Sequence, residues 1–199
     1  MQSFQQQLMM KSATLDIIQV GTLSSLDTDI PMDEYWEYYF SGFIYNQSDI
    51  NKSGEIQVIE YYNNNTGSTT PYTSSSLRIY MGHTTLSAFP SSTVQRDFAT
   101  NYAVGGTMTT VYDGSYTRSS GTGWKSITLD LPNFTYNNSD NLLVKFEYDG
   151  GTYEDLAKAS EWAYNSVSNV SGEAHSTGSI PSSGSRASFR PVTKFHVYG

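Results

Sequence analysis

Residues 123–148 read GWKSITLDLPNFTYNNSDNLLVKFEY, and their pattern decides the fold. In the first half, apolar side chains occupy every second position from Ile127 to Leu131, with Ser, Thr and Asp around them. In the second half, the even-numbered residues of Leu142–Tyr148 are apolar, whereas Lys145 and Glu147 are charged. Alternation with a period of two places one apolar face on a strand. We therefore predict two antiparallel strands, each with one buried and one solvated face.

Short apolar runs separated by polar turns continue along the rest of the chain. Runs of about five to ten residues lie between Gly-, Asn- and Ser-rich clusters, as is typical of strands joined by turns. About nine strands are predicted: Asp16–Val20, Tyr35–Tyr45, Glu55–Asn63, Leu77–Gly82, Met108–Thr117, Trp124–Leu131, Asn141–Tyr148, Ser160–Val167 and Pro191–Tyr198. The expected fold is all-β, an antiparallel two-sheet β-sandwich of jelly-roll type. Residues 1–14 are expected to form an N-terminal arm or leader, and residues 15–199 a single β-sandwich domain.

The composition narrows the classes of function. The 199 residues include no cysteine, which excludes disulfides and thiolate chemistry. Eleven Lys and Arg stand against 19 Asp and Glu, so the basic surface that nucleic-acid binding needs is missing. No apolar run approaches the roughly 20 residues of a membrane-spanning helix. We expect no nucleic-acid partner and no membrane insertion. Met1–Met10 also lacks the charged and apolar regions of a secretory signal.

Catalytic motifs are missing from the sequence. His83, His175 and His196 form no pair at the helical spacing that binds a metal ion. There is no G-x-S-x-G nucleophile motif, and the Gly-rich stretches lack the lysine of a phosphate-binding loop. We predict that the protein is not an enzyme. A glycan-active enzyme stays open as a further alternative, because a pair of catalytic carboxylates cannot be recognised by spacing among 19 acids.

The densest acidic stretch is EYDGGTYED, at residues 147–155. Glu147 and Asp149 are candidate calcium ligands, because Ca²⁺ prefers carboxylate oxygens. The stretch lacks the regular D-x-D-x-D-G spacing of a dedicated calcium loop, so a solvated acidic turn is the alternative. No other cofactor is expected.

An aromatic-rich stretch, YWEYYFSGFIY, begins at Tyr35. If Trp36, Tyr38 and Phe40 face the core, then Tyr35, Tyr39, Phe43 and Tyr45 form an outward row. Exposed aromatic rows serve as protein interfaces or stack on sugar rings. A covering layer of loops is the third explanation. Gly42 is expected to make room for a crossing backbone or a bulge.

Three segments resemble a known family. They are Leu77–Phe89 (LRIYMGHTTLSAF), Gly123–Tyr136 together with Asn141–Val144, and Ser183–Phe195 (SGSRASFRPVTKF). In this order they are similar to the β-sandwich modules of large secreted and surface proteins of Bacteroidota, which often stand beside adhesion domains. The resemblance covers about residues 16–197.

The resemblance implies a non-catalytic module in an extracellular or cell-surface setting, and it brings no catalytic residue. The chain departs from the family pattern at Leu86, Asn133 and residues 147–149. Our leading hypothesis is an extracellular structural or adhesive β-sandwich module, or a subunit of a surface filament or virion, whose partners are proteins or further copies of itself. The alternative is a carbohydrate-binding module that uses exposed aromatic residues to bind glycans.

Overall fold

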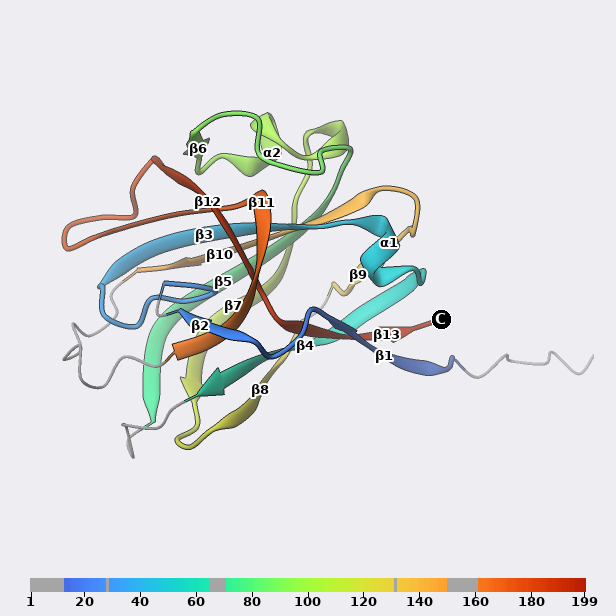
Figure 1. The fold of residues 1–199 in the computed structure, drawn as a ribbon, viewed down its shortest axis with the longest axis horizontal. Helices are drawn as coiled ribbons and strands as arrows, with labels where there is room; N and C mark the ends of the chain where they lie inside the picture. The colour runs from blue at the N-terminus through green and yellow to red at the C-terminus, as the bar shows by residue number, and fades with distance from the viewer. Residues whose placement is uncertain (1–12, 28, 65–70, 131, 150–160) are drawn as a thin grey trace, which may run out of the picture.

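The computed structural model describes residues 13–27, 29–64, 71–130, 132–149 and 161–199. Within these ranges, 13 antiparallel strands join in one continuous hydrogen-bonded sheet (Figure 1). The predicted all-β class is therefore confirmed.

The strands are β1 (Leu15–Val20), β2 (Ser25–Asp27), β3 (Tyr38–Tyr45), β4 (Gly54–Asn64), β5 (Tyr72–Thr84), β6 (Thr93–Gln95), β7 (Thr109–Arg118), β8 (Gly123–Thr128), β9 (Phe134–Tyr136), β10 (Asn141–Tyr148), β11 (Glu161–Ser176), β12 (Ser183–Pro191) and β13 (Thr193–Tyr198). The helical turns are α1 (Gln47–Ile50), α2 (Phe98–Asn101) and η1 (Val104–Gly106). The strands outnumber the nine or so expected. Three of the additional ones, β2, β6 and β9, are only three residues long, and the fourth, β12, is rich in Ser and Arg and lacks alternation.

The sheet runs in the order β1-β13-β4-β11-β3-β10-β5-β7. Strand β11 connects two halves of this sheet, one that contains β1, β13 and β4 and one that contains β3, β10, β5 and β7. Glu161 and Trp162 at the start of β11 pair with β4, and its last six residues pair with β3. Strands β8 and β9 extend the half that contains β4, whereas β12 and β6 extend the other half from β11. The hydrogen bonding is thus continuous although the sheet bends strongly (Figure 1).

The main apolar core lies where side chains of the two halves meet. The Tyr61 ring on β4 lies 5.6 Å from the Phe146 ring on β10, centroid to centroid, and both residues are buried. The Tyr45 ring on β3 lies 5.0 Å from the Phe195 ring on β13 in the same edge-to-face manner. Burying one large apolar side chain stabilises a fold by about 1.5–3 kcal/mol. These contacts therefore help to hold the two halves together.

A second apolar cluster covers the opposite face of β3 and β10. Phe40 and Leu143 contribute to it from the strands. The segment 86–108, which includes β6 and α2, contributes Phe89 and Phe98 and lies over this face (Figure 1). Strand β10 is consequently buried on both faces, and the solvated face predicted for it was wrong.

Glycine lets this covering segment approach the sheet closely. A Cβ atom on Gly42 would lie 2.0 Å from the Phe98 ring, and one on Gly82 would lie 2.4 Å from the sulfur of Met108. Real Cβ atoms do not come this close to other heavy atoms, so a side chain at either position would force the Phe98 ring or the Met108 side chain to move. Gly42 makes room for the Phe98 ring and not for the crossing backbone or bulge that was predicted.

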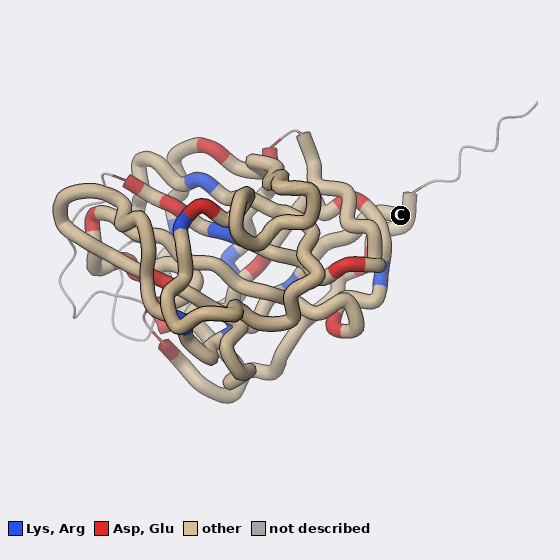
Figure 2. Tube along the Cα trace, turned by 90° about the horizontal axis from the view of Figure 1, so that it is seen from above, with Lys and Arg blue, Asp and Glu red and all other residues tan. Residues whose placement is uncertain are grey.

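Two further features bear on function. None of the helices in the described ranges is long and apolar enough to cross a lipid bilayer. Acidic and basic residues are interspersed along the trace (Figure 2). Several Lys and Arg side chains form ion pairs with nearby carboxylates.

Candidate functional site

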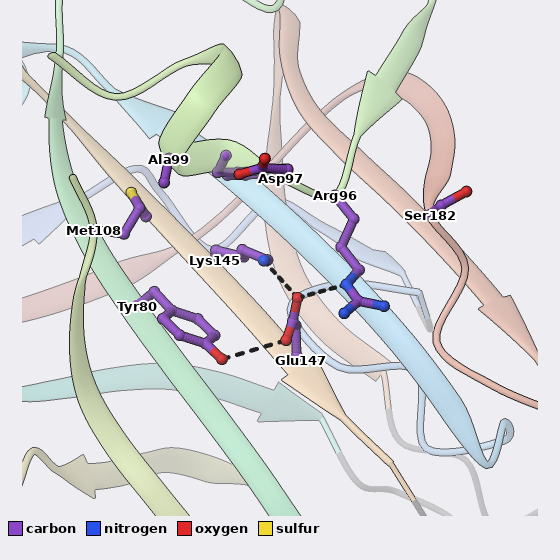
Figure 3. A pocket seen from close by; sticks show the side chains of 9 residues that line it. Tyr80, Arg96, Asp97, Ala99, Met108, Lys145, Glu147 and Ser182 are labelled. Atoms are coloured by element: carbon purple, nitrogen blue, oxygen red, sulfur yellow. Dashed lines mark hydrogen bonds and ion pairs between the residues drawn. The ribbon is translucent and has the colours of Figure 1, made fainter. Parts of the chain in front are cut away.

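A pocket of about 590 Å³ opens between the outer face of β5 and β10 and the segment that covers it. Side chains from the two strands form its floor, and the turn into α2 forms its roof (Figure 3). Its lining residues are Tyr80, Arg96, Asp97, Phe98, Ala99, Met108, Lys145, Glu147 and Ser182.

Glu147 is the centre of the pocket floor. Its side chain is 4 % exposed, and Lys145 Nζ and Arg96 Nε lie 2.5 Å and 3.0 Å from its Oε1 atom. The Tyr80 hydroxyl donates a hydrogen bond to Oε2 at 3.4 Å (Figure 3). A buried carboxylate is costly unless it is paired and hydrogen-bonded. Here three donors from three separate segments meet that requirement.

Lys145 lies between aromatic rings. Its ammonium is 4.9 Å from the Tyr80 ring centroid and 5.4 Å from that of Phe98, both within cation–π range. Burial lowers the pKa of Lys145, and the hydrogen bond to Glu147 opposes that shift. The pKa of Tyr80 is raised by burial and then by the neighbouring Glu147 charge. The floor is thus a fixed network rather than a set of mobile surface charges.

Asp97 is the other acid that lines the pocket. It lies at the N-terminus of α2, where its carboxylate accepts a hydrogen bond from the Thr100 amide at 3.2 Å. That interaction with Thr100 lowers the pKa of Asp97. The carboxylate therefore stays ionised and serves as a helix cap as well as part of the pocket wall.

The structure places the predicted calcium ligands beside cations. Arg78 Nη2 lies 3.1 Å from Asp149 Oδ2, and Arg78 Nε lies 3.9 Å from Glu147 Oε2. A calcium ion at Glu147 would have to compete with the guanidinium and ammonium groups around it. Across the described ranges, no three His, Asp or Glu side chains are grouped as they would be around a metal ion. Residues 150–155 of the acidic stretch lie outside those ranges, and calcium binding here stays a prediction.

The outward aromatic row expected on β3 is not formed. Tyr39, Phe43 and Tyr45 are each 0 % exposed and belong to the main core. They are buried because the half of the sheet that contains β4 and β13 packs against the face they occupy. Tyr35 is half-buried, and its ring meets the Trp36 ring edge-on at 5.1 Å. The opposite face of β3 is also covered, so this strand presents no open aromatic platform.

A second group of acids lies where the segment 29–36 meets β11. Asp33 is 4 % exposed, and burial raises its pKa to about 7. Burial also raises the pKa of Glu173 to about 7, and Asp29 adds to that shift. His175 Nδ1 lies 3.5 Å from Glu173 Oε2, and the His175 ring stacks on Trp36 at 4.2 Å. The sequence contained no signal for this group, because its members come from distant segments.

Sequence reasoning found only part of the pocket. It singled out Glu147, but as a calcium ligand, and it assigned Lys145 to a solvated face. Arg96, Met108 and Ser182 were missed, because they lie in or near turn-rich segments without periodicity. The signal that the sequence did contain was Lys145 and Glu147, two charged residues at alternate positions of the otherwise apolar strand β10.

No protein-family model, curated protein or solved structure matches this chain.

Proposed function

We propose that the protein is a non-catalytic extracellular structural or adhesive module, built as a jelly-roll-like two-sheet sandwich, that binds a saccharide in the pocket above Glu147. The observation that carries this proposal is the buried Glu147 network at the floor of an open pocket. Burying an ion costs several kcal/mol even in a relaxed protein interior. A fold that holds this network beside open space has polar groups already positioned for a ligand.

The chemistry of the lining suits a ligand rich in hydroxyl groups. Each hydroxyl of a saccharide both donates and accepts hydrogen bonds. The lining offers donors on Arg96 and Lys145 and acceptors on Glu147 and Asp97, with formal charges that sum to zero. Met108 and other apolar groups supply the wall against which the carbon face of a sugar can pack. The balance favours a neutral saccharide over a strongly charged ligand.

The geometry of the pocket supports binding without catalysis. Glycoside hydrolysis uses two carboxyl groups about 5–10 Å apart, of which one delivers a proton. Both oxygens of Glu147 are held by cations or by the Tyr80 hydroxyl, and Asp97 caps α2. These contacts support a binding or structural role for both acids rather than proton transfer to a sugar.

The sandwich and the setting of the module are parts of the same proposal. Edge-to-face ring contacts between the two halves of the sheet support a two-layer arrangement. The resemblance to Bacteroidota surface modules supports an extracellular or cell-surface location. A filament or virion subunit would fit the same fold.

A glycan array followed by titration calorimetry tests saccharide binding, and Lys145→Met is the informative variant. We expect the wild type to bind at least one saccharide and Lys145→Met to lose at least tenfold in affinity. Lys194→Met is the matched control, because Lys194 lies over Trp124 at 4.0 Å on another strand and should bind normally. Failure of the wild type to bind any glycan, or equal loss in both variants, would refute the pocket as the site.

One observation favours the enzyme alternative, namely the two carboxyl groups of Asp33 and Glu173 whose pKa values are raised to about 7. A carboxyl that is protonated near neutral pH can act as a general acid. Mass spectrometry of any bound saccharide after incubation decides between the two functions. Cleavage that Asp33→Asn abolishes would establish the enzyme, whereas an intact saccharide supports binding alone.

A further inference from the structure

We infer that the free edge of β1 pairs with β1 of a second copy, so that two chains form a two-fold dimer with one continuous sheet. This inference is independent of the saccharide pocket, which lies on the other half of the sheet. It rests on the backbone pattern of β1 and on the side chains that this strand exposes.

The backbone of β1 is prepared for another strand. Thr14 and Gly199 exchange both backbone hydrogen bonds, at 3.0 Å and 3.2 Å, so Thr14 directs its polar groups toward β13. In an antiparallel pair this direction alternates from residue to residue. Leu15, Ile17 and Gln19 therefore direct their N–H and C=O groups away from β13. Within the described ranges β1 ends the strand order, and no strand pairs with that edge.

The exposed apolar side chains concentrate at the same place. Of the five large apolar residues that are exposed in the described ranges, four lie between positions 15 and 26. Leu15 is 45 % and Ile17 is 55 % exposed, on the face of β1 that points away from the core. Leu23 and Leu26 are 49 % and 42 % exposed, just after β1. An exposed strand edge that also carries apolar side chains is a template for association.

Strand β7, at the opposite end of the strand order, is protected against pairing with another chain, whereas β1 is not. Strand β7 departs twice from regular register with β5 and carries the exposed Asp113. Bulges and outward charges of this kind prevent edge pairing. Strand β1 pairs with β13 in uninterrupted register. Its single charged residue, Asp16, is matched by Lys52 at 2.7 Å. Unpaired charge on this strand therefore does not oppose contact at its edge.

Self-pairing fixes one register. A dyad at Ile17 places Ile17 opposite its own copy, where both residues have their polar groups free to exchange hydrogen bonds. Asp16 then lies opposite Ile18 and never opposite the second Asp16, which avoids a repulsive like-charge pair. A symmetric contact of this kind closes on itself, so it produces a dimer rather than a filament.

Sedimentation equilibrium of the full chain tests the dimer. We expect a mass of twice the 22.1 kDa of one chain, and Ile17→Lys should restore the single-chain mass, because it places two ammonium groups at the dyad. Val104→Lys is the matched control, since Val104 is 42 % exposed outside this region, and it should remain dimeric. Circular dichroism checks that both variants fold. A monomeric wild type, a dimeric Ile17→Lys variant or growth into filaments would overturn the inference.

Cysteine cross-linking tests the register, because the chain has no cysteine of its own. Ile17→Cys should form a disulfide-linked dimer under mild oxidation, since Cα atoms opposite one another in such a pair are about 5.5 Å apart. Val104→Cys should not. A dimer that Ile17→Cys does not cross-link would overturn the register. Saccharide binding by Ile17→Lys should be normal, which separates this inference from the pocket.

Discussion

Arg118 and Glu34 form a two-pronged ion pair that is almost completely buried. Arg118 Nε lies 2.6 Å from Glu34 Oε1 and Nη2 lies 2.9 Å from Oε2, and each side chain is 1 % exposed. Arg118 is the last residue of β7, whereas Glu34 belongs to the segment 29–36 before β3. The pair therefore fastens that segment to the far end of the strand order. Parallel N–H···O bonds of this type are both strong and geometrically specific.

Removing one member of this pair should destabilise the fold strongly. Arg118→Met takes the guanidinium away from a buried carboxylate, and breaking such pairs costs about 3–5 kcal/mol. Urea unfolding measures the loss. The double variant Arg118→Met with Glu34→Leu should recover much of it, because two apolar side chains leave no buried charge behind. A double variant as unstable as Arg118→Met alone would contradict this account.

Stability should fall as the pH rises through neutrality because of Asp33 and Glu173. Their ordinary pKa values are 3.8 and 4.5, and burial raises both to about 7 in the folded protein. Between about pH 4 and 7 the folded state thus holds protons that the unfolded chain has lost. The stabilisation is complete below about pH 4 and disappears as the pH passes 7. The raised pKa of Asp27 acts in the same direction, whereas the lowered pKa of His175 opposes it.

Thermal unfolding across this pH range is the measurement. Asp33→Asn should flatten the dependence, because the amide does not titrate. Asp113→Asn, at an exposed position of β7, is the control and should leave the slope unchanged. Equal slopes in all three proteins would show that Asp33 is not the titrating group.

A side chain at Gly42 should disturb the packing of the covering segment. Gly42→Ala puts a Cβ within 2.0 Å of the Phe98 ring, and overpacking of this kind costs about 1–3 kcal/mol. Gly114→Ala is the matched strand control, because no atom lies within 4 Å of the added Cβ. We expect little change there in urea unfolding. Because Phe98 lines the pocket, Gly42→Ala should also weaken saccharide binding, and equal stability of both variants would argue against the close contact.

Truncation of Phe43 tests whether this residue belongs to the core or to an interaction surface. Phe43 is 0 % exposed, so Phe43→Ala should lower the free energy of unfolding by about 3–5 kcal/mol. Val104→Ala, at an exposed site, should change it by less than about 0.5 kcal/mol. Fluorescence-monitored denaturation measures both. A Phe43→Ala protein of wild-type stability would contradict the placement of Phe43 in the core.

Alternation along the chain was enough to predict the fold class. Ile127 and Leu129 are buried while Ser126, Thr128 and Asp130 are exposed, as a half-buried strand requires. Periodicity in one segment indicates that a strand has an apolar face. It does not indicate what covers the other face, and the expectations for β10 and β3 failed for this reason.

The aromatic residues of β3 show why. Phe40 and Tyr39 are adjacent in sequence and are both buried, but in different clusters on opposite faces. A sequence in which both parities are apolar predicts burial on both sides, but it does not identify the partner of either face. The covering partner of Phe40 lies in the segment 86–108, which has no regular pattern of its own.

The sequence by itself determined that this chain forms short antiparallel strands with apolar faces and has no motif for nucleotide, thiol or His-pair metal chemistry. These properties are local, because side-chain alternation and residue chemistry act over a few positions. Only the tertiary structure decided that Lys145 and Glu147 lie in a pocket with Arg96, and that Asp33 meets Glu173. Those groups come from segments far apart in the chain, and long-range packing alone brings them together and removes them from water.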